Sequence, residues 1–183
     1  WLRNPSLAPD PQAGALISRE IDRIESFGAD LLAGRITTPA GTAFTDVLWI
    51  GIGGSGLGPL LMIRALQQEG RGLPFHVFDN VDPQGFSRTL AALGERLRTT
   101  LVVVVSKSGG TPEPRIGMEQ ARARLEALGG TWPRQAVAVT MAGSQLDALA
   151  ASEGWLARFD LPDWVGGRTS ITGAVGLLPA ALI

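Results

Sequence analysis

The sequence predicts an α/β protein, built as a three-layer αβα sandwich with a doubly wound, mainly parallel sheet. Three observations predict this fold class. Short β-rich runs alternate with segments of helical length along most of the chain. Two of those runs are apolar without polar alternation, which is typical of strands that helices cover on both faces. Successive strands joined through a helix pair in parallel by crossover connections.

The first predicted element is an amphipathic helix that starts at Gln12. Its apolar residues, such as Leu16, Ile24 and Leu31, recur at helical spacing among charged ones, and Gly34 with the following TTPAGT segment ends it. This lead-in, residues 1–44, precedes a single domain at residues 45–183. Four strands are expected in that domain, at residues 47–52, 75–79, 101–105 and 136–139.

Helices are predicted after each of these strands. Asp82 is a good N-cap residue with Pro83 at the first helical position, and Thr111 and Ser144 occupy equivalent places. Gly129 and Gly130 end the third of these helices. The expected ranges are 59–68, 83–93, 112–128 and 144–151, followed by a fifth short strand at 155–159 and a last helix from about Ser170.

Composition excludes several classes of protein. The chain has 183 residues, no Cys and one His, so a disulfide framework, a thiolate metal site and a zinc-hydrolase ligand cluster are excluded. Sixteen basic residues against seventeen acidic ones leave a net charge of -1, which argues against nucleic acid or an anionic membrane as partner. The apolar stretch 171–183 is far shorter than the roughly 20 residues that span a bilayer. Because the chain opens on Trp1 and closes on LLPAALI, we expect a piece of a longer protein.

The first loop of interest is GIGGSGLGP, residues 51–59, which leaves the first strand and enters a helix. Ligands of such sheets bind at the carboxyl ends of the strands, and glycine amides at a helix N-terminus suit an anion. Gly51, Gly53 and Gly56 also match the spacing of dinucleotide sites, with Asp79 where a ribose-binding acid would lie. A pyrophosphate, a single phosphate or merely a tight turn would explain the glycines.

The second loop, SKSGGTPEP at residues 106–114, follows the third strand. It carries three hydroxyls (Ser106, Ser108 and Thr111) and the ammonium of Lys107, which suit the oxygens of a phosphate monoester. The competing interpretation is a simple capped turn, since Thr111 followed by Pro112 starts a helix unaided. Two such loops at one sheet edge favour a sugar phosphate over a dinucleotide.

The third loop, DWVGGRTS at residues 163–170, places Arg168 beside Gly167 on a backbone free to approach a ligand. Arg168 suits a phosphate or a developing oxyanion, and a surface ion pair with Asp163 is the alternative. His76 lies within a strand, which favours a structural role. Glu113 is explained by its place in the first turn of a helix. Trp49, Trp155 and Trp164 are expected in the core.

In this order and at these separations, the three loops resemble the first sugar-isomerase (SIS) domain, of flavodoxin-like architecture, in the glucose-6-phosphate isomerase family, most of all its bacterial forms. The family interconverts glucose 6-phosphate and fructose 6-phosphate in the cytoplasm as a homodimer with two SIS domains, without metal or organic cofactor. The resemblance implies that Gly54, Ser55, Ser106, Lys107, Ser108 and Thr111 bind the substrate phosphate. It implies that Arg168, beside Gly167, stabilises the enediolate.

The sequence departs from the family pattern at four positions. Gly56 stands where Asp is usual, Ser108 where Thr is usual, and Gly109 and Gly110 replace a Phe-Thr pair, which predicts a more flexible cradle. The family's catalytic Glu, and the His and Lys that open the ring, lie in the second SIS domain and C-terminal region, outside the present sequence. We therefore expect weak sugar-phosphate binding without turnover. The alternatives are a non-catalytic phosphosugar-sensing SIS module and a dinucleotide-binding domain.

Overall fold

The protein is organised around a five-stranded sheet whose strands are all parallel, in the order β2-β1-β3-β4-β5. The computed structural model describes residues 4–8 and 10–183. After β1 the chain first moves to β2 on one side and then returns to β3 on the other, so a topological switch point lies between β1 and β3. The strands are β1 (Asp46–Ile50), β2 (Phe75–Phe78), β3 (Thr100–Val105), β4 (Ala136–Thr140) and β5 (Ala157–Asp160).

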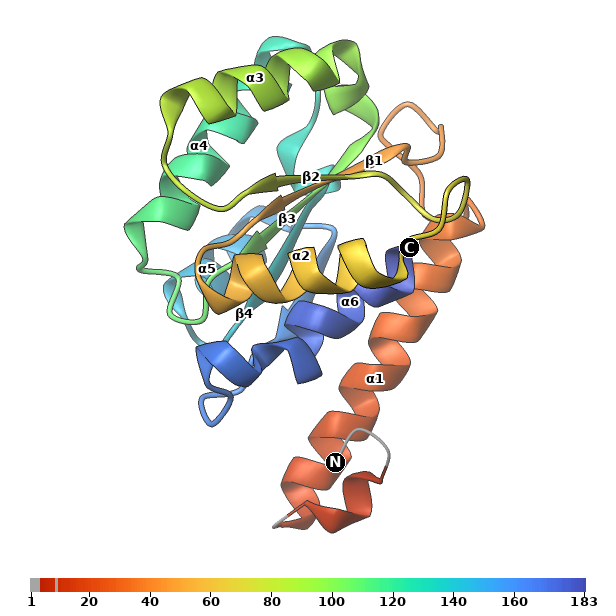
Figure 1. Cartoon of the computed structure of the whole chain (residues 1–183), viewed down its shortest axis with the longest axis vertical. Coiled ribbons are helices and arrows are strands. Elements are labelled where there is room, and N and C mark those ends of the chain that lie inside the picture. Colours follow the sequence, from red (N-terminus) through yellow and green to blue (C-terminus); the bar gives the residue numbers. More distant parts are fainter. Residues whose placement is uncertain (1–3, 9) are drawn as a thin grey trace.

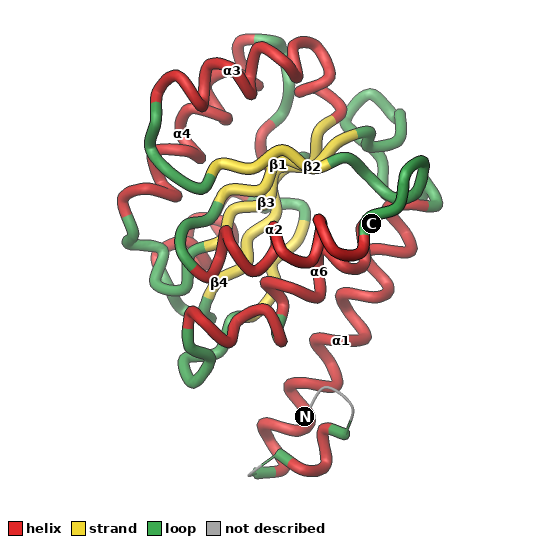
Figure 2. The backbone as a smooth tube through the Cα atoms, in the orientation of Figure 1, coloured by secondary structure: helices red, strands yellow, loops and turns green. Residues whose placement is uncertain are grey.

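Helices cover both faces of the sheet, as Figures 1 and 2 show. α3, α4 and α5 pack on one face, and α1, α2 and α6 lie on the other. The predicted fold class, a doubly wound αβα sandwich, is confirmed. The helices are α1 (Pro11–Leu32), α2 (Gly54–Leu66), α3 (Pro83–Leu93), α4 (Pro112–Ala127), α5 (Gln145–Glu153) and α6 (Ala174–Leu182), with 3-10 helices η1 (Pro5–Leu7), η2 (Gly94–Thr99), η3 (Trp132–Arg134) and η4 (Gly167–Thr172).

The core consists of two apolar clusters, one on each face of the sheet. Successive strand residues alternate between them, so that Val47 and Trp49 of β1 belong to one cluster and Leu48 and Ile50 to the other. Every residue of β1, β3 and β4 is buried. Strands that are apolar on both faces are what a covered parallel sheet requires, which is why the sequence pattern identified them.

The lead-in helix α1 belongs to the same core. It contributes Ile24, Phe27 and Leu31 to the cluster that also contains Leu178 and Leu182 of α6. The two helices approach closely at Gly28, where an added Cβ would lie 2.7 Å from the carbonyl oxygen of Ala181. The N-terminal half of α1 extends beyond the sheet (Figure 1). Among the described residues, no helix is both long and apolar enough to cross a bilayer.

The largest boundary error concerns α2, which begins at Gly54 and not at Pro59 as predicted. Proline lacks the N–H that would reach the carbonyl of Ser55 four residues earlier, so it usually marks a helix start. Here the indole N–H of Trp49 donates to that carbonyl at 2.7 Å. A buried side chain from β1 thus replaces the missing helical bond and lets α2 start five residues earlier.

Smaller differences occur at other element ends. The last helix, expected from about Ser170, is divided at Gly173 into η4 and α6. Asp82 and Ser144 cap their helices through side-chain hydrogen bonds as predicted, whereas the side chain of Thr111 makes no capping bond. Trp49 and Trp155 are buried, but the expectation that Trp164 is a core residue is wrong because 49% of it is exposed.

Candidate functional site

Three loops form the candidate site, and all leave the carboxyl ends of parallel strands. The glycine loop (residues 51–56) follows β1, the hydroxyl loop (106–111) follows β3, and the arginine loop (163–168) follows β5 after a short connection. The first two lie on either side of the switch point between β1 and β3, which is where ligands bind in sheets of this topology. The site is therefore placed by the strand order.

The glycine loop is a tight connection between β1 and α2. Gly53 has φ of +57°, a conformation that favours glycine, and it is the N-cap residue of α2. An added Cβ at Gly56 would lie 2.5 Å from the carbonyl oxygen of Gly51, so the usual family Asp has no room here. Ser55 is half-buried, and its hydroxyl has no hydrogen-bond partner within residues 4–8 and 10–183. That hydroxyl is available to a ligand beside the N-terminus of α2.

The hydroxyl loop is folded by its own serines. The Ser106 hydroxyl accepts a hydrogen bond from the N–H of Gly109 at 3.1 Å, and the Ser108 hydroxyl accepts one from Gly110 at 3.2 Å. Each hydroxyl keeps its own O–H for donation to a ligand. The Thr111 side chain makes no cap bond. The loop therefore offers three hydroxyls, a chemistry suited to phosphate oxygens.

Gly109 fixes the path of this loop. It has φ of +71°, and an added Cβ would lie 2.2 Å from the backbone nitrogen of Leu146 in α5. The Phe that the family usually carries here therefore does not fit this backbone. The more flexible cradle expected from the glycines stays a prediction, and the structure adds that Gly109 is in close contact with α5.

Lys107 joins the hydroxyl loop to the arginine loop. Its ammonium donates hydrogen bonds to the carbonyl oxygens of Asp163 and Val165, the latter at 3.1 Å. An ammonium has three N–H donors, so one remains for another partner. The sequence suggested Lys107 as a phosphate ligand and gave no indication of these two carbonyls.

The arginine loop also touches the glycine loop. A Cβ added at Gly54 would lie 1.9 Å from the carbonyl oxygen of Gly167, so the two backbones are in direct contact. Arg168 follows on an exposed position, and within the described part of the chain no ion pair joins it to Asp163. It lines an open cavity of about 620 Å³ together with Gly53, Gly54 and Gly167. The predicted residues thus come from three separate loops, and the arginine loop contacts each of the other two.

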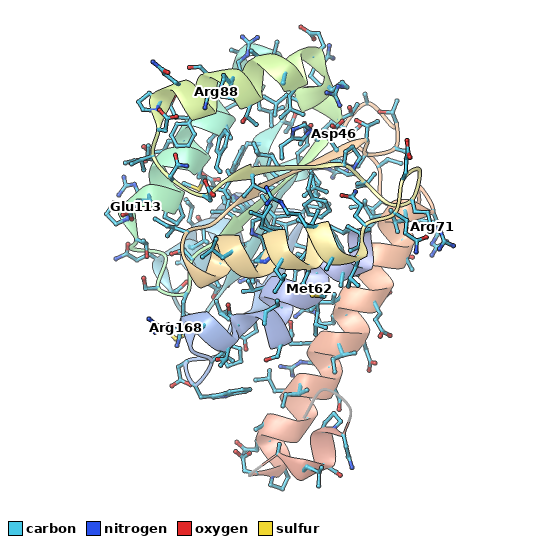
Figure 3. All side chains as sticks on the ribbon, viewed as in Figure 1. Asp46, Met62, Arg71, Arg88, Glu113 and Arg168 are labelled. Carbon is cyan, nitrogen blue, oxygen red and sulfur yellow. The ribbon has the colours of Figure 1, made fainter. Side chains whose placement is uncertain are left out.

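Other singled-out residues lie elsewhere. His76 and Arg96 both donate to the buried carboxylate of Asp46 at the start of β1, at 2.9 and 2.5 Å. Figure 3 labels Asp46 and Arg168 on opposite sides of the molecule, so this cluster is far from the site and has a structural role. Glu113 is half-buried in the first turn of α4. Asp79 is exposed and accepts a hydrogen bond from the side chain of Asn80.

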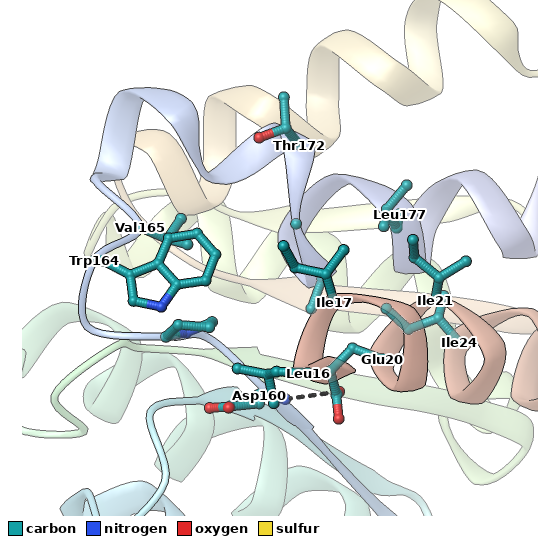
Figure 4. Close-up of a pocket in the computed structure, with 13 residues that line it drawn as sticks. Leu16, Ile17, Glu20, Ile21, Ile24, Asp160, Trp164, Val165, Thr172 and Leu177 are labelled. Carbon is teal, nitrogen blue, oxygen red and sulfur yellow. Dashed lines mark hydrogen bonds between the residues drawn. The ribbon is translucent and has the colours of Figure 1, made fainter. Parts of the chain in front are cut away.

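A second cavity, not predicted from the sequence, lies between α1, α6 and the arginine loop (Figure 4). Its volume is about 490 Å³, and apolar side chains such as Ile17, Ile21 and Leu177 line most of it. Asp160 lies at its edge, where burial raises the pKa of the carboxyl group. Apolar spacing in α1 predicted an amphipathic helix, but spacing does not reveal which part of an apolar face stays uncovered.

Comparison with known proteins identifies the family. The model of the family described as phosphoglucose isomerase matches residues 4–183. Two curated glucose-6-phosphate isomerases, from Prochlorococcus marinus (strain MIT 9313) and Synechococcus sp. (strain CC9605), are each 69% identical to the present chain over its whole length. The chain covers 33% and 34% of these two relatives.

Solved structures agree with this match. The crystal structure of a glucose-6-phosphate isomerase from Chlamydia trachomatis superposes with a TM-score of 0.81 at 31% identity, covering all of this chain and 34% of the other. The crystal structure of a hypothetical protein from Thermus thermophilus superposes with a TM-score of 0.74 at 35% identity, covering all of this chain and 38% of the other. The present chain spans about a third of the length of the curated relatives it matches. By its sequence and its fold, the chain belongs to the phosphoglucose isomerase family.

Proposed function

We propose that this chain is the N-terminal sugar-phosphate-binding SIS domain of a glucose-6-phosphate isomerase, which interconverts glucose 6-phosphate and fructose 6-phosphate. One observation supports the proposal above all. The glycine, hydroxyl and arginine loops meet at the carboxyl edge of the sheet, through the contact of Gly54 with Gly167 and the bonds of Lys107 to the arginine loop. The family match favours this interpretation over a dinucleotide-binding domain.

The substrate phosphate would lie between the glycine loop and the hydroxyl loop. The hydroxyls of Ser55, Ser106, Ser108 and Thr111 have O–H groups to donate, and the N-terminus of α2 beside Gly54 adds a partial positive charge. Lys107, which the resemblance also assigned to the phosphate, has two of its three N–H donors on the carbonyls of Asp163 and Val165 and need not contact the phosphate itself. Several hydroxyl and amide donors of this kind suit a phosphate monoester with three terminal oxygens.

Arg168 would act at the other end of the substrate. Isomerisation moves a proton between C2 and C1 through a cis-enediolate, whose oxygens carry more negative charge than the sugar does. A guanidinium fixed beside these oxygens binds the enediolate more strongly than the ground state, which lowers the barrier. The exposed position of Arg168 beside Gly167, without an ion pair to Asp163, leaves it available for this role.

The remaining machinery would come from outside the present sequence. Leu57 and Leu61 are 64% and 62% exposed and line the same cavity as Arg168. In our proposal a second SIS domain covers them and brings the general base that moves the proton. The family resemblance also implies a homodimer in the cytoplasm and no metal or organic cofactor, and these remain predictions.

The proposal is tested with the protein expressed from its complete gene. We expect turnover of fructose 6-phosphate, a large loss of kcat in Arg168→Ala, and a raised KM in the double variant Ser106→Ala/Thr111→Ala. Arg98→Met, an exposed arginine in η2, serves as the control for the loss of one positive charge. Residues 1–183 alone should bind fructose 6-phosphate in a thermal-shift assay without turning it over. Stabilisation by NAD and not by sugar phosphates would contradict the proposal.

A further inference from the structure

We propose that Lys107 is a positioning residue, which holds the arginine loop in place for Arg168 through the carbonyls of Asp163 and Val165. This inference rests on the proposed function for its kinetic part. Its structural part stands on the contacts alone: the ammonium of Lys107 donates to two carbonyls that lie 56 and 58 residues further along the chain. Two of its three N–H donors are therefore committed to the backbone of another loop.

Hydrogen bonds from another loop matter for the arginine loop because it has little secondary structure of its own. Residues 161–166 form turns and irregular backbone between β5 and η4. Leu161 is buried and Val165 packs partly against the core, but Asp163, Gly166, Gly167 and Arg168 are exposed, so burial fixes only part of this stretch. Hydrogen bonds from a charged donor contribute more to stability than neutral ones. The backbone of Lys107 is also well fixed, because it directly follows the buried strand β3.

A second contact limits the loop from the other side. The backbone of Gly54 lies against the carbonyl of Gly167, so the loop cannot move closer to the glycine loop. The Lys107 bonds hold the same loop toward the exit of β3. Arg168 thus follows directly after a backbone segment that both the glycine loop and the hydroxyl loop contact. Because these two loops would bind the phosphate, phosphate binding and the position of Arg168 are linked through Lys107.

The kinetic test is carried out on the protein expressed from its complete gene, with Lys107→Met as the main variant. Met keeps most of the side-chain length and removes all donors. We expect kcat to fall about 10- to 100-fold, since a misplaced catalytic group costs this much, while KM for fructose 6-phosphate changes by about threefold or less. A direct phosphate contact predicts the opposite split, in which KM rises about tenfold or more with kcat nearly kept, and that result would overturn the proposal.

Two further measurements make the role of Lys107 specific. In an Arg168→Ala background, Lys107→Met should cause little additional loss of kcat, because its effect passes through Arg168; full additivity would count against the proposal. Arg98→Met, which also removes one exposed positive charge, should leave both constants unchanged.

Hydrogen–deuterium exchange tests the structural part without any activity. In Lys107→Met, the amides of residues 163–168 should exchange faster, while those of β3 and α4 keep their protection. If the parent protein proves inactive, the proposed isomerase function fails, but the exchange measurement still tests whether Lys107 holds the arginine loop. Unchanged exchange at residues 163–168 would show that the two carbonyl bonds do not hold the loop.

Discussion

The backbone of Gly54 lies against the carbonyl of Gly167, so closely that a Cβ at position 54 would be 1.9 Å from that oxygen. This contact joins the start of α2 to the segment that carries Arg168. Because the obstacle is a backbone atom and not the end of a flexible side chain, a methyl group at Gly54 must displace one of the two loops.

We therefore expect Gly54→Ala to lower kcat by up to about 100-fold in the protein expressed from its complete gene. The matched control is Gly173→Ala, where an added Cβ would be 3.6 Å from its nearest neighbour, the carbonyl of Ser170, and φ is −117°. Steady-state kinetics and thermal unfolding of both variants provide the comparison. Normal activity of Gly54→Ala would mean that the loop contact adapts without consequence.

The Trp49 indole provides a second test. Its N–H donates to the Ser55 carbonyl, whose usual helical partner is missing because residue 59 is proline. Trp49→Phe leaves that carbonyl unpaired, and we expect it to cost about 1–3 kcal/mol more than the lost packing alone. Trp132→Phe is the control: Trp132 is 1% exposed, and within the described residues its indole N–H has no partner.

Urea unfolding of these two variants measures the difference. Both substitutions shrink a buried indole to a phenyl ring, so the packing loss is similar. Trp132→Phe also removes a buried N–H that has no partner among the described residues, so the excess is an upper bound on the contribution of the Trp49 hydrogen bond. Equal free energies of unfolding for the two variants would contradict the assigned role of Trp49. Faster amide exchange in the glycine loop of Trp49→Phe should accompany the loss of stability.

The pair formed by Arg122 and Glu153 joins α4 to α5. Arg122 donates to both carboxylate oxygens of Glu153, at 2.8 and 3.0 Å, and its guanidinium lies 6.0 Å from the centre of the Trp132 ring. Burial opposes ionisation of Glu153, but hydrogen bonds from Arg122 and Trp155 outweigh it and hold the pKa of that carboxyl below its ordinary value.

We expect Arg122→Met to lower the free energy of unfolding by about 1 kcal/mol at pH 7, since solvent screens part of the interaction. Because the pKa of Glu153 is lowered in the folded state, the stability it contributes is lost as pH falls through that lowered pKa. The control, Arg115→Met, breaks the exposed pair with Glu119 on the same helix and should cost nearly nothing. A similar loss of unfolding free energy in both variants would show that the pair of Arg122 with Glu153 stabilises the fold no more than an exposed pair does.

Asp160 should have the opposite dependence on pH. Burial beside the apolar cavity raises the pKa of its carboxyl group, although the N–H of Ala142 opposes this. A raised folded-state pKa means that stability falls as pH rises from the ordinary Asp value of about 3.9 through the folded value. Asp160→Asn should therefore be more stable than the parent at pH 7, and this gain should disappear near pH 4.

Urea midpoints of the parent and Asp160→Asn, measured at pH 4 and pH 7, test this expectation. Asp22→Asn, which removes an exposed carboxylate of α1, is the control and should change stability little at either pH. A midpoint difference that does not depend on pH would mean that Asp160 is not the titrating group.

Much of the fold could be predicted because local signals bracket its elements. α3 was predicted at 83–93 and lies there, since Asp82 and Pro83 start it and Gly94 ends it. The strands were identified from apolar runs, and the candidate loops from the polar and glycine residues at the strand exits. The start of α2 was missed because it depends on Trp49, a partner that adjoins Ser55 only after β1 and α2 have packed.

The contacts within the site were beyond local signals for the same reason. The sequence identified Lys107 as a cation in a loop of hydroxyls, but its bonds to Asp163 and Val165 depend on the path of a loop more than fifty residues away. The contact of Gly54 with Gly167 is likewise long-range. Residue type predicted which groups could bind an anion, whereas their mutual placement is set by the strand order.

That strand order also has a consequence during synthesis on the ribosome. β1 has only two neighbours, and the nearer in sequence pairs Val47 with Phe75, so β1 has no partner until 28 further residues are made. At about 5–20 residues per second this takes roughly one to six seconds. A segment that is apolar from Val47 to Ile50 therefore spends that time without a strand beside it. The nascent chain should be most prone to aggregation, and most dependent on chaperones, before residue 75 emerges.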